Sequence, residues 1–215
     1  MNWLFKINNT AYFWSLCALC GLFALLSKQF LYTDQLYFYT LSEQFTSEQI
    51  NKILSYQNAT WKQVLGYCLI PLFIIIRVLY TSLCLFIGNL VNETNWNYKT
   101  IYTLSLKSDI AFTLSQICNF YYYAISDNYK TVEDLGINCC SLLKVVGMES
   151  IPNWLIFAFN SINIFELIYV ILLVLFIKIC FKITYIKSIV FVLLTYCIGN
   201  YLFVTGLTFL YLNFS

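Results

Sequence analysis

The sequence predicts an all-α protein, a polytopic bundle of about five transmembrane helices. Of its 215 residues, 60% are hydrophobic and only 10% are charged, whereas about 25% of residues are charged in ordinary soluble domains. The mean hydropathy is +0.73. The apolar residues also gather in runs long enough to cross about 30 Å of hydrocarbon, which takes roughly 20 helical residues. We therefore expect a single transmembrane domain over residues 1–215.

The first expected span covers residues 10–31, and a polar loop at 33–62 follows it. Inside this loop, Thr46 and Gln49 have the spacing of a capping box, in which each side chain bonds a free backbone N–H of the other residue. Apolar residues then recur at helical spacing. The loop should therefore contain a short amphipathic helix on the membrane surface.

The second expected span, 63–90, is long enough to tilt, and Pro71 should kink it because proline removes a backbone donor. The third span, 100–125, is interrupted by Lys107 and Asp109. A polar run of this kind is tolerated in a membrane only where it faces the protein interior or water.

A second polar loop covers residues 126–153 and ends in two helix signals, Gly147 as a stop and Pro152 as a start. The last two spans, 155–177 and 188–212, form a hairpin. Gly199 and Gly206 lie seven residues apart in the last span, which suggests close packing against another helix.

Lysines predict the orientation. The short segment 178–187 carries three lysines and no acid, and an excess of this kind marks a cytoplasmic loop. Alternation then places the N-terminus and the turn at 91–99 in the cytoplasm. The loops 33–62 and 126–153 and the C-terminus lie outside. The sequence does not indicate which membrane holds the protein.

Arg77 and Glu166 are the strongest candidates for a functional site. Each lies about 18–21 Å along an inward-running span, close to the middle of the membrane. A lone charge there costs at least about 2.5–3.5 kcal/mol, so we expect the two side chains to pair. The pair could be a proton or substrate site, or a clamp that fixes how two helices pack.

Lys107 and Asp109 are the other intramembrane candidates. Because they are two residues apart, they should point in different directions on a helix. They could line a water-filled vestibule on the cytoplasmic side. Alternatively, the third helix simply begins near Ile110, which we favour.

Several classes of chemistry are disfavoured. The chain has no histidine, which excludes bis-histidine haem, histidine-based zinc sites and imidazole acid–base catalysis. We therefore expect no catalytic residue, no cofactor and no metal. The net charge of +2 is too small to suggest nucleic acid as a partner. The expected partners are the lipid bilayer and other membrane proteins.

The nine cysteines leave a thiol oxidoreductase open as an alternative. Cys17 and Cys20 share one helix face, and Cys139 and Cys140 lie together in an outer loop. Against redox chemistry, Cys17 and Cys20 lie deep in the first span, where a thiolate is poorly solvated.

Several features from about residue 60 onward resemble the Yip (Ypt-interacting protein) family of five-helix membrane proteins. They are Pro71 early in a span, IPNW at 151–154, NSINIFEL at 160–167 and the lysine-rich turn. The resemblance implies five spans with a cytoplasmic N-terminus. The Asp-Leu-Tyr-Gly-Pro motif of the trafficking members is missing, so their Rab-GTPase contacts are not carried over to any residue.

The function that the sequence favours is a non-enzymatic interaction, assembly or trafficking-type component. The alternative is a small transporter or permease subunit that uses the Arg77–Glu166 pair. Transport predicts a water-accessible cavity between spans two, three and four that reaches Arg77. Assembly predicts a dry bundle with a large apolar or aromatic face.

Overall fold

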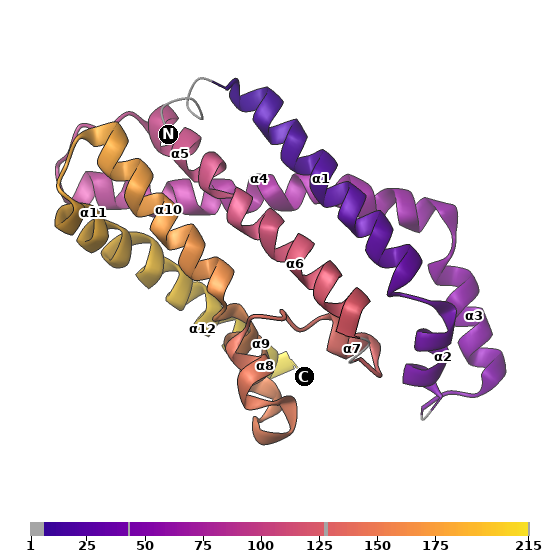
Figure 1. The fold of residues 1–215 in the computed structure, drawn as a ribbon. Helices are drawn as coiled ribbons and strands as arrows, with labels where there is room; N and C mark the ends of the chain where they lie inside the picture. The colour runs from indigo at the N-terminus through magenta and orange to yellow at the C-terminus, as the bar shows by residue number, and fades with distance from the viewer. Residues whose placement is uncertain (1–6, 43, 127–128, 215) are drawn as a thin grey trace.

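A computed structural model confirms the all-α fold (Figure 1). The structure describes residues 7–42, 44–126 and 129–214, and within these ranges it contains no β-strand. The helices are α1 (Asn9–Phe30), α2 (Asp34–Leu41), α3 (Ser47–Gln57), α4 (Thr60–Val91), α5 (Tyr98–Ser108), α6 (Ile110–Ser126), α7 (Val132–Leu135), α8 (Leu142–Val146), α9 (Asn153–Ser161), α10 (Ile164–Phe181), α11 (Tyr185–Val192) and α12 (Ile198–Phe214). A short 3₁₀ turn (Met148–Ser150) precedes α9, and a π turn (Leu193–Cys197) joins α11 to α12.

Four helical segments of the described chain are long and apolar enough to cross a membrane, which indicates a membrane protein. They are α1, α4, α10 and the continuous segment Tyr185–Leu210. The expected third span is instead two shorter helices, α5 and α6, which meet at Asp109. Five spans were expected, whereas four helical segments of the described chain meet the length and composition of a membrane span.

The α5–α6 pair lies in the middle of the bundle, where it packs against α1, α4 and α10 (Figure 1). Because these apolar helices pack against it, the polar side chains near its junction are shielded from lipid. The buried polar residues of this pair and its junction are Ser105, Lys107, Ser108, Asp109, Thr113 and Ser115. This central position explains why the segment is the least apolar of the expected spans.

Three segments far apart in the sequence meet at one end of the bundle. Asn9 at the start of α1 donates a hydrogen bond to Thr103 of α5 at 2.8 Å. Trp96, in the turn after α4, stacks on Phe181 at the end of α10, with ring centroids 3.9 Å apart. The start of α1, the turn before α5 and the turn after α10 therefore share this end, as the expected alternation requires.

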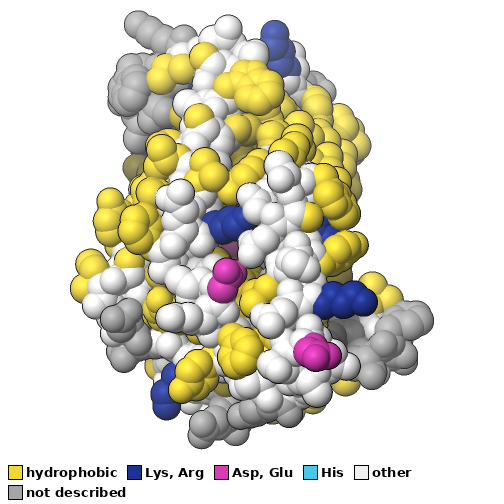
Figure 2. All heavy atoms as spheres, turned by 90° about the vertical axis from the view of Figure 1, so that its right-hand side faces the viewer, with side chains coloured by type: hydrophobic (Ala, Val, Ile, Leu, Met, Phe, Trp, Pro, Cys, Tyr) yellow, Lys and Arg dark blue, Asp and Glu magenta, His cyan; other side chains and the backbone are white. Residues whose placement is uncertain are grey.

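The opposite end carries the two long loops. α1 leads into α2 and α3 there, and Leu31 and Leu36 pack with Tyr123 and Leu135. Figure 2 views this side of the molecule. Polar atoms and a few charged side chains cover the middle of the face, and apolar side chains lie along its edges.

The expected helix in the first loop is present as α3. The backbone N–H of Thr46 donates to Oε1 of Gln49 at 3.0 Å, which confirms this part of the capping box. α2 was not expected. In the second loop, Gly147 ends α8 with a φ of +89°, a conformation that glycine adopts without strain.

The expected span 155–177 is wrong as a single helix. It consists of α9 and α10, with a break at Ile162 and Asn163. The outer loop pairs with this break: the backbone N–H of Leu142 donates to the Ile162 carbonyl at 2.8 Å, and the N–H of Ile164 donates to the Cys140 carbonyl at 3.2 Å. These bonds satisfy backbone groups that a break would otherwise leave free in an apolar setting.

Candidate functional site

The ion pair at the centre of the bundle joins Arg77 to Asp109. Nε and Nη2 of Arg77 donate to the two carboxylate oxygens of Asp109, each at 2.7 Å. The guanidinium also lies over the ring of Phe112, 4.0 Å from its centroid. Two parallel bonds of this kind fix geometry as well as charge. The pair therefore ties α4 to the α5–α6 junction.

The expected pairing of Arg77 with Glu166 is wrong. Both lie about 21–23 Å from the ends of α4 and α10 that meet the turns of the shared end, so the depths agree. However, the α5–α6 junction brings the fully buried carboxylate of Asp109 to the guanidinium. A carboxylate in that position needs a cation most, because it has no access to water.

Lys107 and Asp109 are both fully buried, so neither lines a vestibule open to water at the membrane edge. They point to different partners, as their spacing predicts. Nζ of Lys107 donates to the Ile7 carbonyl at 3.2 Å and lies 3.9 Å from the ring centroid of Tyr12. The Tyr12 hydroxyl in turn donates to the Lys107 carbonyl at 3.0 Å. α6 does begin at Ile110, but α5 precedes it directly.

Glu166 lies in the first turn of α10 rather than in the middle of a long helix, because the chain breaks just before it. Asn163 caps α10, and its side chain accepts a bond from the Glu166 N–H at 2.9 Å. The positive end of the helix dipole favours a carboxylate in this turn. The break in the fourth expected span therefore positions the acid.

Two side chains from the last helix hold the Glu166 carboxylate. Oε1 accepts bonds from the Tyr196 hydroxyl at 2.7 Å and from the Asn200 amide at 3.2 Å. Oε2 has no hydrogen bond from the described residues, and no lysine or arginine among them forms an ion pair with Glu166. This acid in the membrane thus has polar neighbours but no basic partner.

Tyr196 reaches Glu166 from the π turn Leu193–Cys197. A π turn inserts a residue into a helix and re-aims the side chains around it, and such turns are frequent at functional sites. Two departures from regular helix, the break before α10 and this π turn, therefore converge on one carboxylate.

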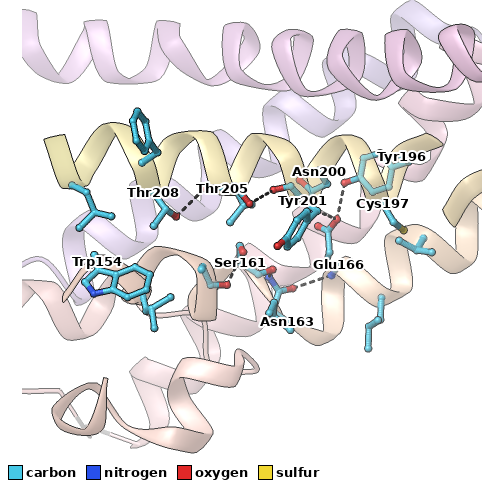
Figure 3. Close-up of a pocket in the computed structure, with 18 residues that line it drawn as sticks. Trp154, Ser161, Asn163, Glu166, Tyr196, Cys197, Asn200, Tyr201, Thr205 and Thr208 are labelled. Atoms are coloured by element: carbon cyan, nitrogen blue, oxygen red, sulfur yellow. Dashed lines mark hydrogen bonds between the residues drawn. The ribbon is translucent and has the colours of Figure 1, made fainter. Parts of the chain in front are cut away.

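Glu166 lies at the polar end of a groove of about 590 Å³ between α9, α10 and α12 (Figure 3). We call this cavity the Glu166 groove. It opens on the lipid-facing side, since Leu167 and Tyr201 on its wall are more than 60% exposed. Its lining comprises Trp154, Leu155, Ala158, Ser161, Ile162, Asn163, Glu166, Leu167, Val170, Tyr196, Cys197, Asn200, Tyr201, Val204, Thr205, Thr208, Phe209 and Leu212.

A second cavity, of about 490 Å³, reaches Arg77 from the end of the bundle that carries the long loops. Ser115, Gln116 and Asn119 of α6 line it together with Ser27 of α1. It lies between the first three expected spans rather than between the second, third and fourth. Arg77 keeps 35% of its side chain exposed there, whereas Asp109 is closed off.

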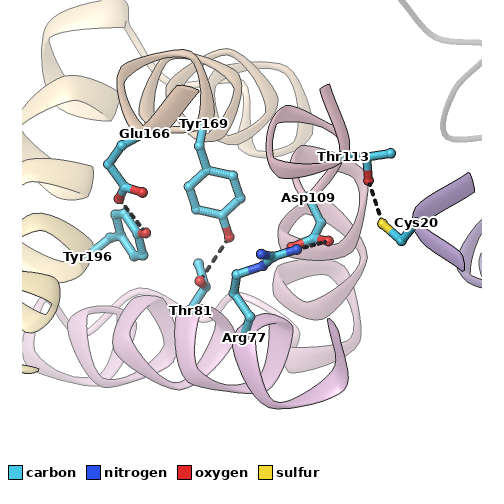
Figure 4. Close-up of polar contacts among 8 residues, drawn as sticks. All are labelled: Cys20, Arg77, Thr81, Asp109, Thr113, Glu166, Tyr169 and Tyr196. Carbon is cyan, nitrogen blue, oxygen red and sulfur yellow. Dashed lines mark hydrogen bonds and ion pairs between the residues drawn. The ribbon is translucent and has the colours of Figure 1, made fainter. Parts of the chain in front are cut away.

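Tyr169 separates the two charged groups (Figure 4). It is fully buried, and its hydroxyl donates to Thr81 of α4 at 2.8 Å. Its ring contacts Phe112 on one side and Tyr196 on the other, with centroids 4.8 and 5.3 Å away. The Arg77–Asp109 pair and the Glu166 groove are thus neighbouring but distinct sites.

The structure places the thiols of the loop pair Cys139 and Cys140 in contact, without a disulfide. All nine cysteines are free thiols, and Sγ of Cys139 lies 3.5 Å from Sγ of Cys140. Burial and the neighbouring Cys140 raise the pKa of the Cys139 thiol to about 12. Since the thiolate is the reactive form, a raised pKa keeps this thiol in its less reactive protonated form near neutral pH.

Sequence reasoning missed Tyr196, Asn200 and Asn163. The available signal was weak: Tyr196 and Asn200 are four residues apart and share one face of an otherwise apolar helix. Asn163 gave the signal of a cap inside an apparent span. Compared with known protein families, curated proteins and solved structures, the chain matches none at a significant level.

Proposed function

We propose that this chain is a non-enzymatic multi-pass membrane protein of transporter or permease-component type, with Glu166 as its ligand-binding group. In this proposal Glu166 acts without Arg77, whose partner is Asp109. The Arg77–Asp109 pair takes the role of the helix clamp.

The observation that carries the proposal is the setting of the Glu166 carboxylate. It faces a groove of about 590 Å³, within the range of small-molecule sites. Oε2 has no hydrogen bond from the described residues, and a broken helix and a π turn both position the group. A purely structural carboxylate would be expected to have a basic partner, as Asp109 does.

The assembly hypothesis, with or without a Yip-like relationship, fits the cavities less well. It expects a dry bundle, whereas a cavity lined in part by polar side chains reaches Arg77 from the loop-bearing end. We retain a Yip-like arrangement of five crossings as part of the proposal, with α5 and α6 together as the third.

The proposed orientation places the end of the bundle that contains the turns before α5 and after α10 in the cytoplasm. The N-terminus lies at this end and the C-terminus outside. Lysine distribution supports this orientation: Lys178, Lys182 and Lys187 surround the turn after α10 without an acid nearby in sequence.

Transport is tested with purified full-length protein in liposomes. The vesicles are exposed to a mixture of small molecules, washed, and their contents identified by mass spectrometry. At least one compound should accumulate with the wild type and with the Glu48→Gln control, a surface acid outside the groove, but not with Glu166→Gln or in protein-free vesicles. Equal contents in all four would contradict transport and leave assembly as the better hypothesis.

A further inference from the structure

We propose that the Glu166 groove binds a lipophilic organic cation: an apolar, preferably aromatic body that carries one positively charged amine or onium group. The inference rests on the proposed function and names the class of ligand. The cationic group would lie against the Glu166 carboxylate, and the apolar body would lie along α9 and α12.

Charge is the first argument. Among the described residues on the wall of the groove, Glu166 is the one Asp, Glu, Lys or Arg, and none of the described lysines or arginines forms an ion pair with it. The two bonds from Tyr196 and Asn200 go to Oε1, which leaves Oε2 toward a ligand. A positive group supplies the counter-charge that this apolar setting requires.

The serine and threonine hydroxyl groups on the wall are the second argument, because each of them already donates to a backbone carbonyl. Thr205 donates to the Tyr201 carbonyl at 2.8 Å, and Thr208 donates to the Val204 carbonyl at 2.9 Å. Ser161 likewise donates to the Ala158 carbonyl at 2.8 Å. Away from Glu166, Asn163 and Asn200, the wall is mainly apolar and aromatic and suits an apolar body better than a sugar or another hydroxyl-rich solute.

Aromatic rings are the third argument. Tyr196 lies beside the carboxylate, and Tyr201 and Trp154 line the groove farther along (Figure 3). Ring faces attract cations, and Trp and Tyr do so best. The combination of one carboxylate with several aromatic rings selects an organic cation over a neutral apolar molecule.

The same lining disfavours anionic lipids. No lysine or arginine of the described chain lines the groove, so a phosphate group would lie against the Glu166 carboxylate without a counter-charge. The lysines of the described chain lie elsewhere: Lys178, for example, lies over the ring of Tyr185, 3.4 Å from its centroid, at the opposite end of α10.

Two ions of the same shape and opposite charge provide the test. Full-length protein in a non-ionic detergent is titrated with tetraphenylphosphonium and, separately, with tetraphenylborate, by calorimetry and by the fluorescence of the tryptophans, which include Trp154. We expect saturable binding of tetraphenylphosphonium at one site per chain, and at least tenfold weaker binding of tetraphenylborate. Equal binding of the two ions would overturn the proposal, because it would mean that the groove recognises the apolar shape of a ligand and not its charge.

Variants locate the binding site. Glu166→Gln should weaken tetraphenylphosphonium binding at least tenfold, Glu166→Asp should retain most of it, and the Glu48→Gln control should bind like the wild type. Unchanged binding by Glu166→Gln would contradict the assignment. If Glu166→Gln does not fold, judged by circular dichroism and gel filtration, the comparison of the two ions on the wild type still decides.

The vesicle experiment separates the two levels of the inference. Glu166-dependent accumulation of a compound that is not a cation, without tetraphenylphosphonium binding, would refute the ligand class and preserve the transport function. Tetraphenylphosphonium binding without accumulation of any compound would support the site and refute transport.

Discussion

At the scale of single residues, the two buried acids differ in how the fold treats them. Asp109 is fully buried and receives two bonds from Arg77. Glu166 is only half-buried and receives bonds from uncharged groups. A fully buried carboxylate without a cation would be very costly, and the ion pair with Arg77 removes that cost for Asp109. Under the proposed function, Glu166 is the group that meets a ligand.

The first prediction concerns the ion pair. Arg77→Leu should destabilise the protein by about 3–5 kcal/mol, because it leaves Asp109 buried without a counter-charge. Asp109→Leu should cost less, because the guanidinium of Arg77 remains 35% exposed in the polar cavity. The double substitution should recover much of the loss. Thermal unfolding in detergent measures all three.

The control for this cycle pairs Arg77 with Glu166. Arg77→Leu and Glu166→Leu should lower the melting temperature additively, because the two groups do not pair. Additive stability losses in the Arg77/Asp109 double variant would contradict the described ion pair. So would a recovery of stability in the Arg77/Glu166 double variant.

At the scale of helices, the sequence predicted which segments are apolar better than where each helix ends. α1, α4 and the continuous segment from α11 to α12 follow the expected spans 10–31, 63–90 and 188–212 closely, because long apolar runs have few alternatives in a membrane. The break at Ile162 and Asn163 escaped prediction, since it depends on backbone bonds from Leu142 and Ile164 to distant partners.

The site was only partly predictable for the same reason. Arg77, Glu166, Lys107 and Asp109 stand out as charges in apolar segments. The central position of α5 and α6 decides which of these charged side chains meet. The depth of a residue along a helix does not tell in which direction around the helix its side chain points. No residue pattern in the sequence predicts the π turn that directs Tyr196 toward Glu166.

The second prediction concerns the contact between α4 and the π turn. A methyl group at Gly88 would overlap Cγ2 of Thr195. Gly88→Ala should therefore destabilise the protein by about 1–3 kcal/mol, as overpacking does. Adding Thr195→Ser removes the overlapping methyl group and should restore stability, measured by thermal unfolding in detergent.

Gly206→Ala is the matched control for this substitution. No atom lies within 4 Å of a Cβ built at Gly206, so this variant should be neutral or more stable by up to about 1 kcal/mol, since alanine favours helix over glycine. Equal losses for Gly88→Ala and Gly206→Ala would mean that the π turn does not pack on α4 as described.

At the scale of the whole molecule, the contacts at the two ends give a consistent arrangement. One end gathers the start of α1 and the turns before α5 and after α10, and the other carries both long loops. Both cavities described above extend from the loop-bearing half, since their walls include Leu135 in one case and Trp154 in the other. Under the proposed orientation, the cavity at Arg77 lies toward the outside, whereas the Glu166 groove opens toward lipid in the outer half of the bundle.

The third prediction tests that orientation with native lysines. When the protein is expressed at the surface of intact cells, a membrane-impermeant amine reagent should modify Lys52, which is exposed in α3, but not Lys99 or Lys187, which are exposed at the other end. All three should react after permeabilisation. Lys107 is fully buried and should stay unmodified in both conditions. Labelling of Lys99 and Lys187 in intact cells, with Lys52 protected, would invert the topology.

The most direct test of the central claim is whether a ligand-sized reagent in the membrane reaches Glu166 but not Asp109. An apolar carbodiimide, which couples to carboxyl groups in apolar surroundings, is added to the full-length protein in liposomes, and the modified peptides are identified by mass spectrometry. We predict modification of Glu166, protection of Glu166 by tetraphenylphosphonium, and no modification of Asp109. Modification of both acids or of neither would contradict the distinction between an open binding carboxylate and a closed structural one.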